Sequence, residues 1–171
     1  TINGWTQLGN DIDGEAAGDQ SGYSLSLSSD GTILAVGAPY NDGTGSSAGH
    51  ARVYQWSSGS WTQLGSDIDG ESSGDQSGIS VSLSSDGTIL AVGANYNGGS
   101  FAGAGHVRVH QFSGGSWAQL GNDIDGEAAG DELGISVSLN SDGTILAIGA
   151  NYNDGNGADA GHVRVYQFSD N

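Results

Sequence analysis

The sequence predicts an all-β fold made of three consecutive four-stranded antiparallel sheets. A unit of 56 residues occurs three times, so that Trp5, Trp61 and Trp117 hold equivalent positions. Within each unit, large apolar residues alternate with small polar ones, which is the period of a half-buried strand and not of a helix. Glycine supplies 32 of the 171 residues against a single proline, and its regular placement indicates tight turns between short strands.

The first unit shows its predicted strands and turns in order. It begins with WTQLG at residues 5–9, which an acidic stretch separates from GYSLSLS at residues 22–28. GYSLSLS places three large apolar side chains on one face and three serines on the other. The turn from Ser29 to Thr32 contains an Asp-Gly pair, which is typical of a tight hairpin. TILAVGA at residues 32–38 is apolar on both faces, which suits a strand buried on both sides.

A loop rich in glycine, from Tyr40 to Gly49, leads to the last strand of the unit, HARVYQW at residues 50–56. Four short antiparallel strands in a unit of about 40 to 60 residues are typical of a β-propeller blade. The serines of one strand and the small residues Ala35 and Gly37 of the next would allow neighbouring blades to approach closely. We therefore expect a single repeat domain over residues 1–171, with repeats at about 1–56, 57–112 and 113–171.

The central part of each unit resembles the FG-GAP repeat, known from the integrin α-chain propeller and many extracellular proteins. The segments that carry the resemblance are GYSLSLSSDGTILAVGAP and GHARVYQW, and their counterparts occur in all three units. The Phe-Gly pair of the family reads Ser-Gly in two units and Leu-Gly in the third. The Gly-Ala-Pro triplet is intact at Pro39 and becomes Gly-Ala-Asn at Asn95 and Asn151. The resemblance implies propeller-type blades.

The resemblance also implies a calcium loop, at a place where this sequence departs from the family. Integrin-type repeats carry an Asp-rich calcium loop between the FG strand and the GAP strand. Here that connection is only Ser29 to Thr32, which is too short for such a loop. The family's calcium site is therefore not carried over to this chain.

Three blades are fewer than the about four to eight with which propellers close. An arc of three would leave two blade faces and two sheet edges open, and such surfaces favour association. The chain starts on a WTQLG strand and ends on the strand HVRVYQF, so its first strand is expected to complete the last blade of a partner or of a longer array. We expect completion by self-association, with two copies giving six blades, or by further repeats.

An acidic stretch, DIDGEAAGD in the first unit, recurs in every unit at the same predicted end of the blades as the long loop. Its carboxylates at positions 1, 3, 5 and 9 could supply the oxygen ligands that calcium takes, although its glycine does not match the EF-hand turn. The alternative is a solvated turn in which Asp19 caps backbone N–H groups or pairs with an arginine. The candidate calcium ligands are Asp11, Asp13, Glu15, Asp19, Asp67, Asp69, Glu71, Asp75, Asp123, Asp125, Glu127 and Asp131.

Three other repeated side chains have both a structural and a functional interpretation. The mid-strand arginine (Arg52 in the first unit) is expected to pair with a repeated Asp between blades, because an unpaired buried charge is costly. The histidine two residues before it (His50) could bind a transition metal, and loop closure by hydrogen bonds is favoured. The tryptophan at the start of the unit (Trp5) could stack on a sugar, and packing between blades is favoured.

Composition excludes several functions. Twenty Asp and Glu against three Arg and no Lys give a net charge of −17, which repels nucleic-acid phosphates and anionic membranes and suits a saline, extracellular setting. No apolar run is long enough for membrane insertion. The sequence has no Cys, no HExxH and no nucleophile-elbow motif, and every Ser, His and Asp of interest recurs threefold. We therefore expect that the chain is not an enzyme.

These observations predict an extracellular structural or adhesive module that assembles with itself into a ring or filament and presents an acidic loop face. The alternative function is a carbohydrate-binding, lectin-like propeller module, in a calcium-dependent or calcium-independent form. The expected partners are a second copy or a longer repeat array, glycans and extracellular proteins. Calcium is the one cofactor that the sequence suggests.

Overall fold

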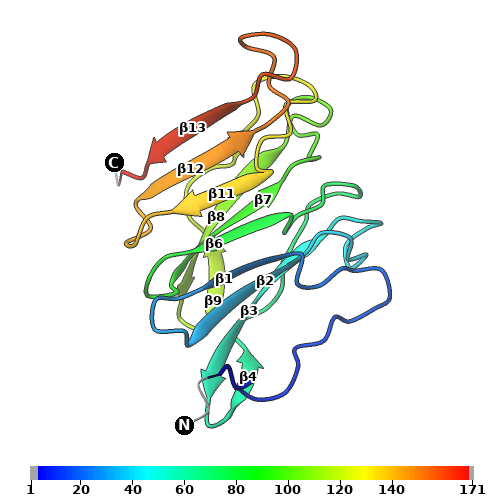
Figure 1. The fold of residues 1–171 in the computed structure, drawn as a ribbon. Helices are drawn as coiled ribbons and strands as arrows, with labels where there is room; N and C mark the ends of the chain where they lie inside the picture. The colour runs from blue at the N-terminus through cyan, green and yellow to red at the C-terminus, as the bar shows by residue number, and fades with distance from the viewer. Residues whose placement is uncertain (1–3, 170–171) are drawn as a thin grey trace.

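The computed structural model describes residues 4–169 and shows three antiparallel sheets stacked one after another (Figure 1). These residues form thirteen strands and no helix, which confirms the predicted all-β class with propeller-type blades. None of the described residues therefore belongs to a helix that could cross a membrane. The N-terminal segment and the third sheet lie at opposite ends of the stack.

Each sheet repeats the same strand order. The first sheet contains β1 (Ser24–Leu27), β2 (Ile33–Ala38), β3 (His50–Ser57), β4 (Ser60–Gln63) and the short β5 (Ile68–Asp69), which pairs with β3. The second sheet contains β6 (Ser80–Leu83), β7 (Ile89–Ala94), β8 (His106–Ser113), β9 (Ser116–Gln119) and the short β10 (Ile124–Asp125), which pairs with β8. The third sheet contains β11 (Ser136–Leu139), β12 (Ile145–Ala150) and β13 (His162–Gln167). The sequence does not predict β5 and β10, which lie inside acidic stretches.

The fourth strand of a sheet comes from the repeat that follows it. β4 carries the WTQLG motif of the second repeat and pairs with β3, with Trp61 opposite Trp56. β9 pairs with β8 in the same register, with Trp117 opposite Phe112. Within the described residues, the third sheet has no fourth strand.

The first WTQLG motif, residues 5–9, does not form a strand. The sequence prediction is wrong here because a strand needs a partner, and the partner of this motif would belong to a sheet preceding the first one. Trp5 is fully exposed as a result, whereas Trp61 and Trp117 are partly buried.

The core lies between successive sheets. Ile33 and Val53 of the first sheet belong to one apolar cluster with Val81 of the second sheet. A second cluster joins the second sheet to the third through residues such as Val107 and Ile148. All six residues of β7 are buried, because a sheet lies on each side of this strand. This confirms for β7 the prediction that the TILAVGA-type strand is buried on both faces, whereas β12 of the terminal third sheet is only partly buried.

Small side chains let the sheets approach closely. The hydroxyl of Ser24 donates to the carbonyl oxygen of Gly78 in the next repeat at 2.8 Å. The hydroxyl of Ser26 accepts from the backbone N–H of Leu83 in β6 at 2.9 Å. The same two hydrogen bonds recur between the second and third sheets. The serine face of each first strand therefore lies against the neighbouring sheet, as the sequence pattern predicts.

Replacing Gly93 in β7 by alanine should destabilise the fold. The added Cβ would lie 2.1 Å from the carbonyl oxygen of Gly134 in the next repeat, so the two sheets would have to move apart. We expect the free energy of unfolding in urea to fall by about 1–3 kcal/mol. Gly149→Ala, compared in dilute solution where the outer face of the third sheet is in water, is the matched control, because the three atoms nearest its added Cβ all belong to Ser136 of its own sheet. Equal losses in the two variants would contradict close packing between sheets as the cause.

Candidate functional site

The acidic stretches and the long loops lie at one end of the sheets, and the hairpin turns lie at the other (Figure 1). Asn41 of the first long loop bonds Asp19 of the acidic stretch in its own repeat. The hydroxyl of Thr44, in the same loop, donates to the carbonyl oxygen of Gly70 in the acidic stretch of the next repeat at 2.8 Å. The first long loop is therefore fastened between two acidic stretches.

In each repeat, a buried Asp–Asn pair links the acidic stretch to the long loop. The carboxylate of Asp19 accepts the N–H of Ala16 at 3.1 Å and the side-chain amide of Asn41 at 2.9 Å. Asn41 in turn accepts the N–H of Gly43 at 2.8 Å. The pairs Asp75–Asn97 and Asp131–Asn153 repeat this geometry. The last Asp of each stretch therefore caps backbone N–H groups, as the solvated-turn alternative predicts, although it is buried.

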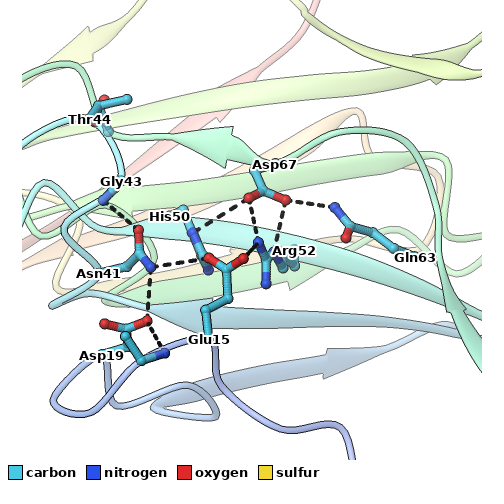
Figure 2. Close-up of polar contacts among 11 residues, drawn as sticks. Glu15, Asp19, Asn41, Gly43, Thr44, His50, Arg52, Gln63 and Asp67 are labelled. Atoms are coloured by element: carbon cyan, nitrogen blue, oxygen red, sulfur yellow. Dashed lines mark hydrogen bonds and ion pairs between the residues drawn. The ribbon is translucent and has the colours of Figure 1, made fainter.

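Arg52 is the centre of a charged cluster that joins two repeats (Figure 2). Its guanidinium donates to the two carboxylate oxygens of Asp67 at 2.8 and 2.6 Å, and it lies 2.5 Å from a carboxylate oxygen of Glu15. Glu15 is the fifth residue of the first acidic stretch and Asp67 is the first residue of the second. His50 completes the cluster, with its Nδ1 3.9 Å from Asp67. Gln63 of β4 donates to Asp67 at 2.6 Å.

Strand pairing brings these side chains together. β5 pairs with β3, with Ile68 opposite Ala51, and this places the preceding Asp67 beside Arg52. His50 and Arg52 are two residues apart on β3, so their side chains point to the same face. That H-x-R spacing is the sequence signal from which the proximity of the histidine and the arginine could have been predicted. Nothing local in the sequence indicates that acids of two successive repeats converge on them.

Hydrogen bonding and burial shift the ionisation of this cluster. The hydrogen bonds from Arg52 hold the pKa of the Asp67 carboxyl below its ordinary value. Asp67 in turn raises the pKa of the Arg52 guanidinium. Burial, followed by the charge of Arg52, lowers the pKa of His50. The cluster therefore contains an ionised Asp67, a cationic Arg52 and a neutral His50 near pH 7.

The equivalent clusters of the second and third repeats are looser. Arg108 lies 3.4 Å from Glu71 and donates to a backbone carbonyl at 2.6 Å. Arg164 lies 3.7 Å from Glu127 and donates to a backbone carbonyl at 3.2 Å. Arg52 does pair with a repeated Asp, as predicted, but Asp67 directly precedes β5, which pairs with β3, so the pair lies within the first sheet and not between blades.

Two groups of three side chains among residues 4–169 have the composition of a metal site. They are Glu15, His50 and Asp67, and Glu71, His106 and Asp123, with ligand atoms within 4.8 Å of one another in each group. Imidazole with carboxylate suits a transition metal better than calcium, which prefers oxygen. In the first group the guanidinium of Arg52 already forms ion pairs with both carboxylates.

The structure distributes the twelve predicted calcium ligands among three environments. Asp19, Asp75 and Asp131 belong to the buried Asp–Asn pairs. The residues of the charged clusters are Glu15, Asp67, Glu71, Asp123 and Glu127. The remaining four, Asp11, Asp13, Asp69 and Asp125, are exposed. Neither metal-type group contains two acids of the same stretch, and calcium binding by these residues stays a prediction.

His110 breaks the threefold symmetry of the sheets. It occupies the position that Tyr54 holds in the first repeat and Tyr166 in the third. It is buried, and its Nδ1 has no hydrogen-bond partner among the described residues. Burial, followed by the charge of Arg108, lowers the pKa of His110 to about 4.

A comparison with protein families identifies the repeat. The FG-GAP repeat matches residues 12–54 and 124–166, about half of the chain. The chain belongs to the FG-GAP repeat family. Both matched segments run from an acidic stretch to the third strand of a sheet, so the family match omits the WTQLG strand. A comparison with curated protein sequences finds no match to this FG-GAP protein.

Solved structures similar to this FG-GAP protein share its stacked sheets. The periplasmic gluconolactonase of Pseudomonas aeruginosa aligns with a TM-score of 0.54 and 24% identity, over 84% of this chain and 38% of that one. A chain of the mitotic checkpoint complex aligns with a TM-score of 0.54 and 13% identity, over 86% of this chain and 37% of that one. The FG-GAP chain therefore spans well under half the length of these proteins, and at such identities the likeness shows the fold alone.

The expectation that the chain is not an enzyme is corrected by the first of these structures. An arrangement of sheets similar to this one is found in a gluconolactonase, so the repeated fold does not exclude catalysis. The exclusion relied on the threefold recurrence of polar residues in the sequence. Equal residues do not have equal surroundings, because Arg52 binds an Asp in bidentate fashion, Arg108 does not, and His110 has no histidine counterpart in the other repeats.

Replacing Arg52 by glutamine should lower the free energy of unfolding by about 1–3 kcal/mol, the range for hydrogen bonds to charged groups. The variant leaves Asp67 and Glu15 without their cation. Arg164→Gln is the matched control, because its one carboxylate partner lies 3.7 Å away and both side chains are more exposed. In urea denaturation at high dilution, where the outer face of the third sheet is in water, we expect that control to lose less than about 1 kcal/mol. Equal losses would show that the bidentate pair does not stabilise the junction.

The stability of the fold should fall as the pH falls from 6.5 towards 4. The unfolded chain protonates His110 near 6.5, whereas the folded chain does so only near 4, so protons favour unfolding in this window. The slope from one such group is at most about 1.4 kcal/mol per pH unit. His110→Tyr, which installs the residue of the other two repeats, should flatten the slope in urea denaturation at several pH values. The remaining slope would come from groups such as His50 and His106, whose pKa values burial also lowers. A slope unchanged in the variant would contradict this role of His110.

Proposed function

We propose that this FG-GAP chain is a structural module whose copies associate head to tail through the open faces of its first and third sheets. The observation that supports it is the exposure of two apolar faces whose counterparts are buried elsewhere in the same chain. One face is on the third sheet and the other is on the first. They lie at the two ends of the stack (Figure 1).

The open face of the third sheet is a copy of a buried one. Val163 and Val165 of β13 are 68% and 67% exposed. The equivalent residues Val107 in β8 and Val53 in β3 are 0% and 1% exposed, because another sheet covers them. Apolar surface of this kind gains about 25 cal/mol per Å² when it is removed from water.

The open face of the first sheet is the natural counterpart. Leu25 and Leu27 of β1 are 60% and 57% exposed. The equivalent Val81 and Leu83 of β6 are 8% and 7% exposed, because they pack on the first sheet. The first sheet of one copy therefore presents the kind of surface that covers the preceding sheet within the chain.

Polar groups on the two faces match as well. Ser80 donates to the carbonyl oxygen of Gly134, and Ser82 accepts from the N–H of Leu139. Ser136 and Ser138 stand at the same positions on the exposed side of β11. On a second copy, the carbonyl oxygen of Gly22 and the N–H of Leu27 would be their partners. Two copies joined in this way at both ends would form a ring of six sheets, within the about four to eight of known propellers.

Association would align the acidic loop ends of the copies on one side of the ring. Each copy carries a net charge of −17, so like charges repel across the junction. Salt screens this repulsion, and the Debye length falls to about 8 Å at physiological ionic strength. We therefore propose a saline, extracellular setting, with the acidic face available to a cationic partner surface.

The native mass of the chain should be about twice 17.1 kDa at physiological salt and should fall towards the monomer at low salt. Val165→Glu should give the monomer at both salt concentrations, because the charge would be buried against the next copy. Native mass spectrometry or analytical ultracentrifugation measures this, with circular dichroism to show that the variant is folded. Thr62→Glu, at an exposed position of β4, is the control that should still associate. A wild-type mass of 17.1 kDa at all concentrations would overturn the proposal.

A further inference from the structure

We propose that residues 4–13 of one copy form the fourth strand of the third sheet of the next copy, with Trp5 docked in a cavity beside β13. This inference rests on the proposed head-to-tail association and specifies the segment that fastens it. It is carried by the strand register, by a cavity, by an arginine with one carboxylate partner where Arg52 has two, and by the position of the segment itself.

The register within the chain assigns the partner of each residue. β3 pairs through Gln55 with Thr62 of β4 and, at its other end, through Ala51 with Ile68 of β5. β8 repeats both pairings with β9 and β10. Applied to the third sheet, the same register places Gln167 of β13 opposite Thr6 of a second copy. It also places Val163 of β13 opposite Ile12 of that copy. Gln167 and Val163 are both exposed in the single chain.

The tryptophans of the second and third motifs each occupy a defined site against the preceding sheet. The indole N–H of Trp117 donates to the carbonyl oxygen of Leu64 at 2.9 Å, and its ring packs on Phe112 with centroids 5.2 Å apart. Trp61 makes the same contacts with the carbonyl oxygen of Leu8, at 3.2 Å, and with the ring of Trp56. Each tryptophan therefore packs on one aromatic side chain and donates to one backbone carbonyl oxygen.

The third sheet has that site without a tryptophan. Leu120, the counterpart of Leu64, and Phe168, the counterpart of Phe112, line a cavity of about 170 Å³. The cavity is mainly apolar and also contacts Leu146 and Tyr166. Trp5 is the one tryptophan of the three motifs that is fully exposed. In the cavity its ring would pack on Phe168, and its N–H would donate to the carbonyl oxygen of Leu120.

Charge complementarity points to the same docking. Arg52 has a carboxylate of its own repeat, Glu15, and the first acid of the next repeat, Asp67. Arg164 has Glu127 of its own repeat at 3.7 Å, and the described chain contains no following acidic stretch. The residue equivalent to Asp67 is Asp11, which a docked segment would bring to Arg164 of the neighbouring copy.

The N-terminal segment meets the first sheet at the position where the connector between the first two sheets meets the second sheet. Gly9 packs against the ring of Trp56, as Gly65 packs against the rings of Trp117 and Phe112. Gly65 belongs to the connector that enters the second sheet from the preceding one. The N-terminal segment and β13 lie at opposite ends of the stack, so in the proposed head-to-tail arrangement residues 4–7 of one copy lead to the third sheet of another (Figure 1).

Disulfide cross-linking between two single-cysteine variants tests the docking. The chain has no cysteine, so Thr6→Cys and Gln167→Cys each introduce a unique thiol at an exposed position. Directly opposed residues of antiparallel strands have Cα atoms about 4.5–5.5 Å apart, which is within disulfide range. When the two variants are mixed and oxidised at physiological salt, we expect a cross-linked heterodimer on a non-reducing gel. Addition of reductant should cleave the cross-link and return both chains to the monomer band.

Thr62→Cys mixed with Gln167→Cys is the matched control, because Thr62 is the same motif residue but is already paired with Gln55. This mixture should give only background cross-linking. Equal cross-linking in the two mixtures, or none in either, would overturn the docking of residues 4–13. Native mass measured on the same samples separates the two proposals. A double mass without the specific cross-link would retain association through the faces and reject the strand exchange, whereas a monomeric mass would reject both.

Trp5→Ala provides a second measurement without cysteines. Trp5 is fully exposed in the single chain, so the substitution should leave its melting temperature at high dilution unchanged. If Trp5 fills the cavity of the next copy, the variant should associate at least about tenfold more weakly, as is typical of a buried aromatic anchor. An unchanged dissociation constant would contradict docking of the indole.

Discussion

The structure depends on apolar contact between sheets that are apolar on both of their faces. A sheet of this kind cannot bury both faces by itself, so each one is stabilised by the sheets before and after it. The second sheet shows the result, since all residues of β7 are buried. The serine, alanine and glycine positions make the contact close enough for hydrogen bonds between serine hydroxyls of one sheet and backbone groups of the next repeat. Stability in this chain is therefore a property of neighbouring pairs of sheets and not of single repeats.

The acidic stretches are compatible with this packing because their charge is partly neutralised where the repeats meet. The buried Asp of each stretch accepts hydrogen bonds from backbone and asparagine N–H groups, which satisfies it without a second charge. The three arginines of the chain all occupy the same position of the repeat, on β3, β8 and β13, and the next acidic stretch returns to this strand in the first two sheets. The exposed acids of the stretches face water at one end of the sheets. Net charge and a packed core are thus separated in space.

Much of the fold could be predicted from local sequence pattern. The alternation in GYSLSLS, the apolar TILAVGA strand and the Asp30-Gly31 turn each specify a local structure, and the structure contains all three. The rest depends on partners distant in the sequence. Residues 5–9 have strand composition but no strand beside them, and β5 is too short to show a period. The acids of one stretch were grouped by their proximity in sequence, whereas Glu15 and Asp67 meet through pairing of β3 with β5.

The borrowed fourth strand makes the sequence repeat and the folded unit differ in phase. A fragment of residues 57–112 would contain β4 of one sheet and β6 to β8 of the next, without β9. A fragment from Asp67 to Gln119 would contain all four main strands of a single sheet, β6 to β9. Recombination between related arrays would therefore preserve whole sheets only when the crossover falls in an acidic stretch. The acidic stretches are therefore the segments in which recombination can add or remove whole sheets during the evolution of such an array.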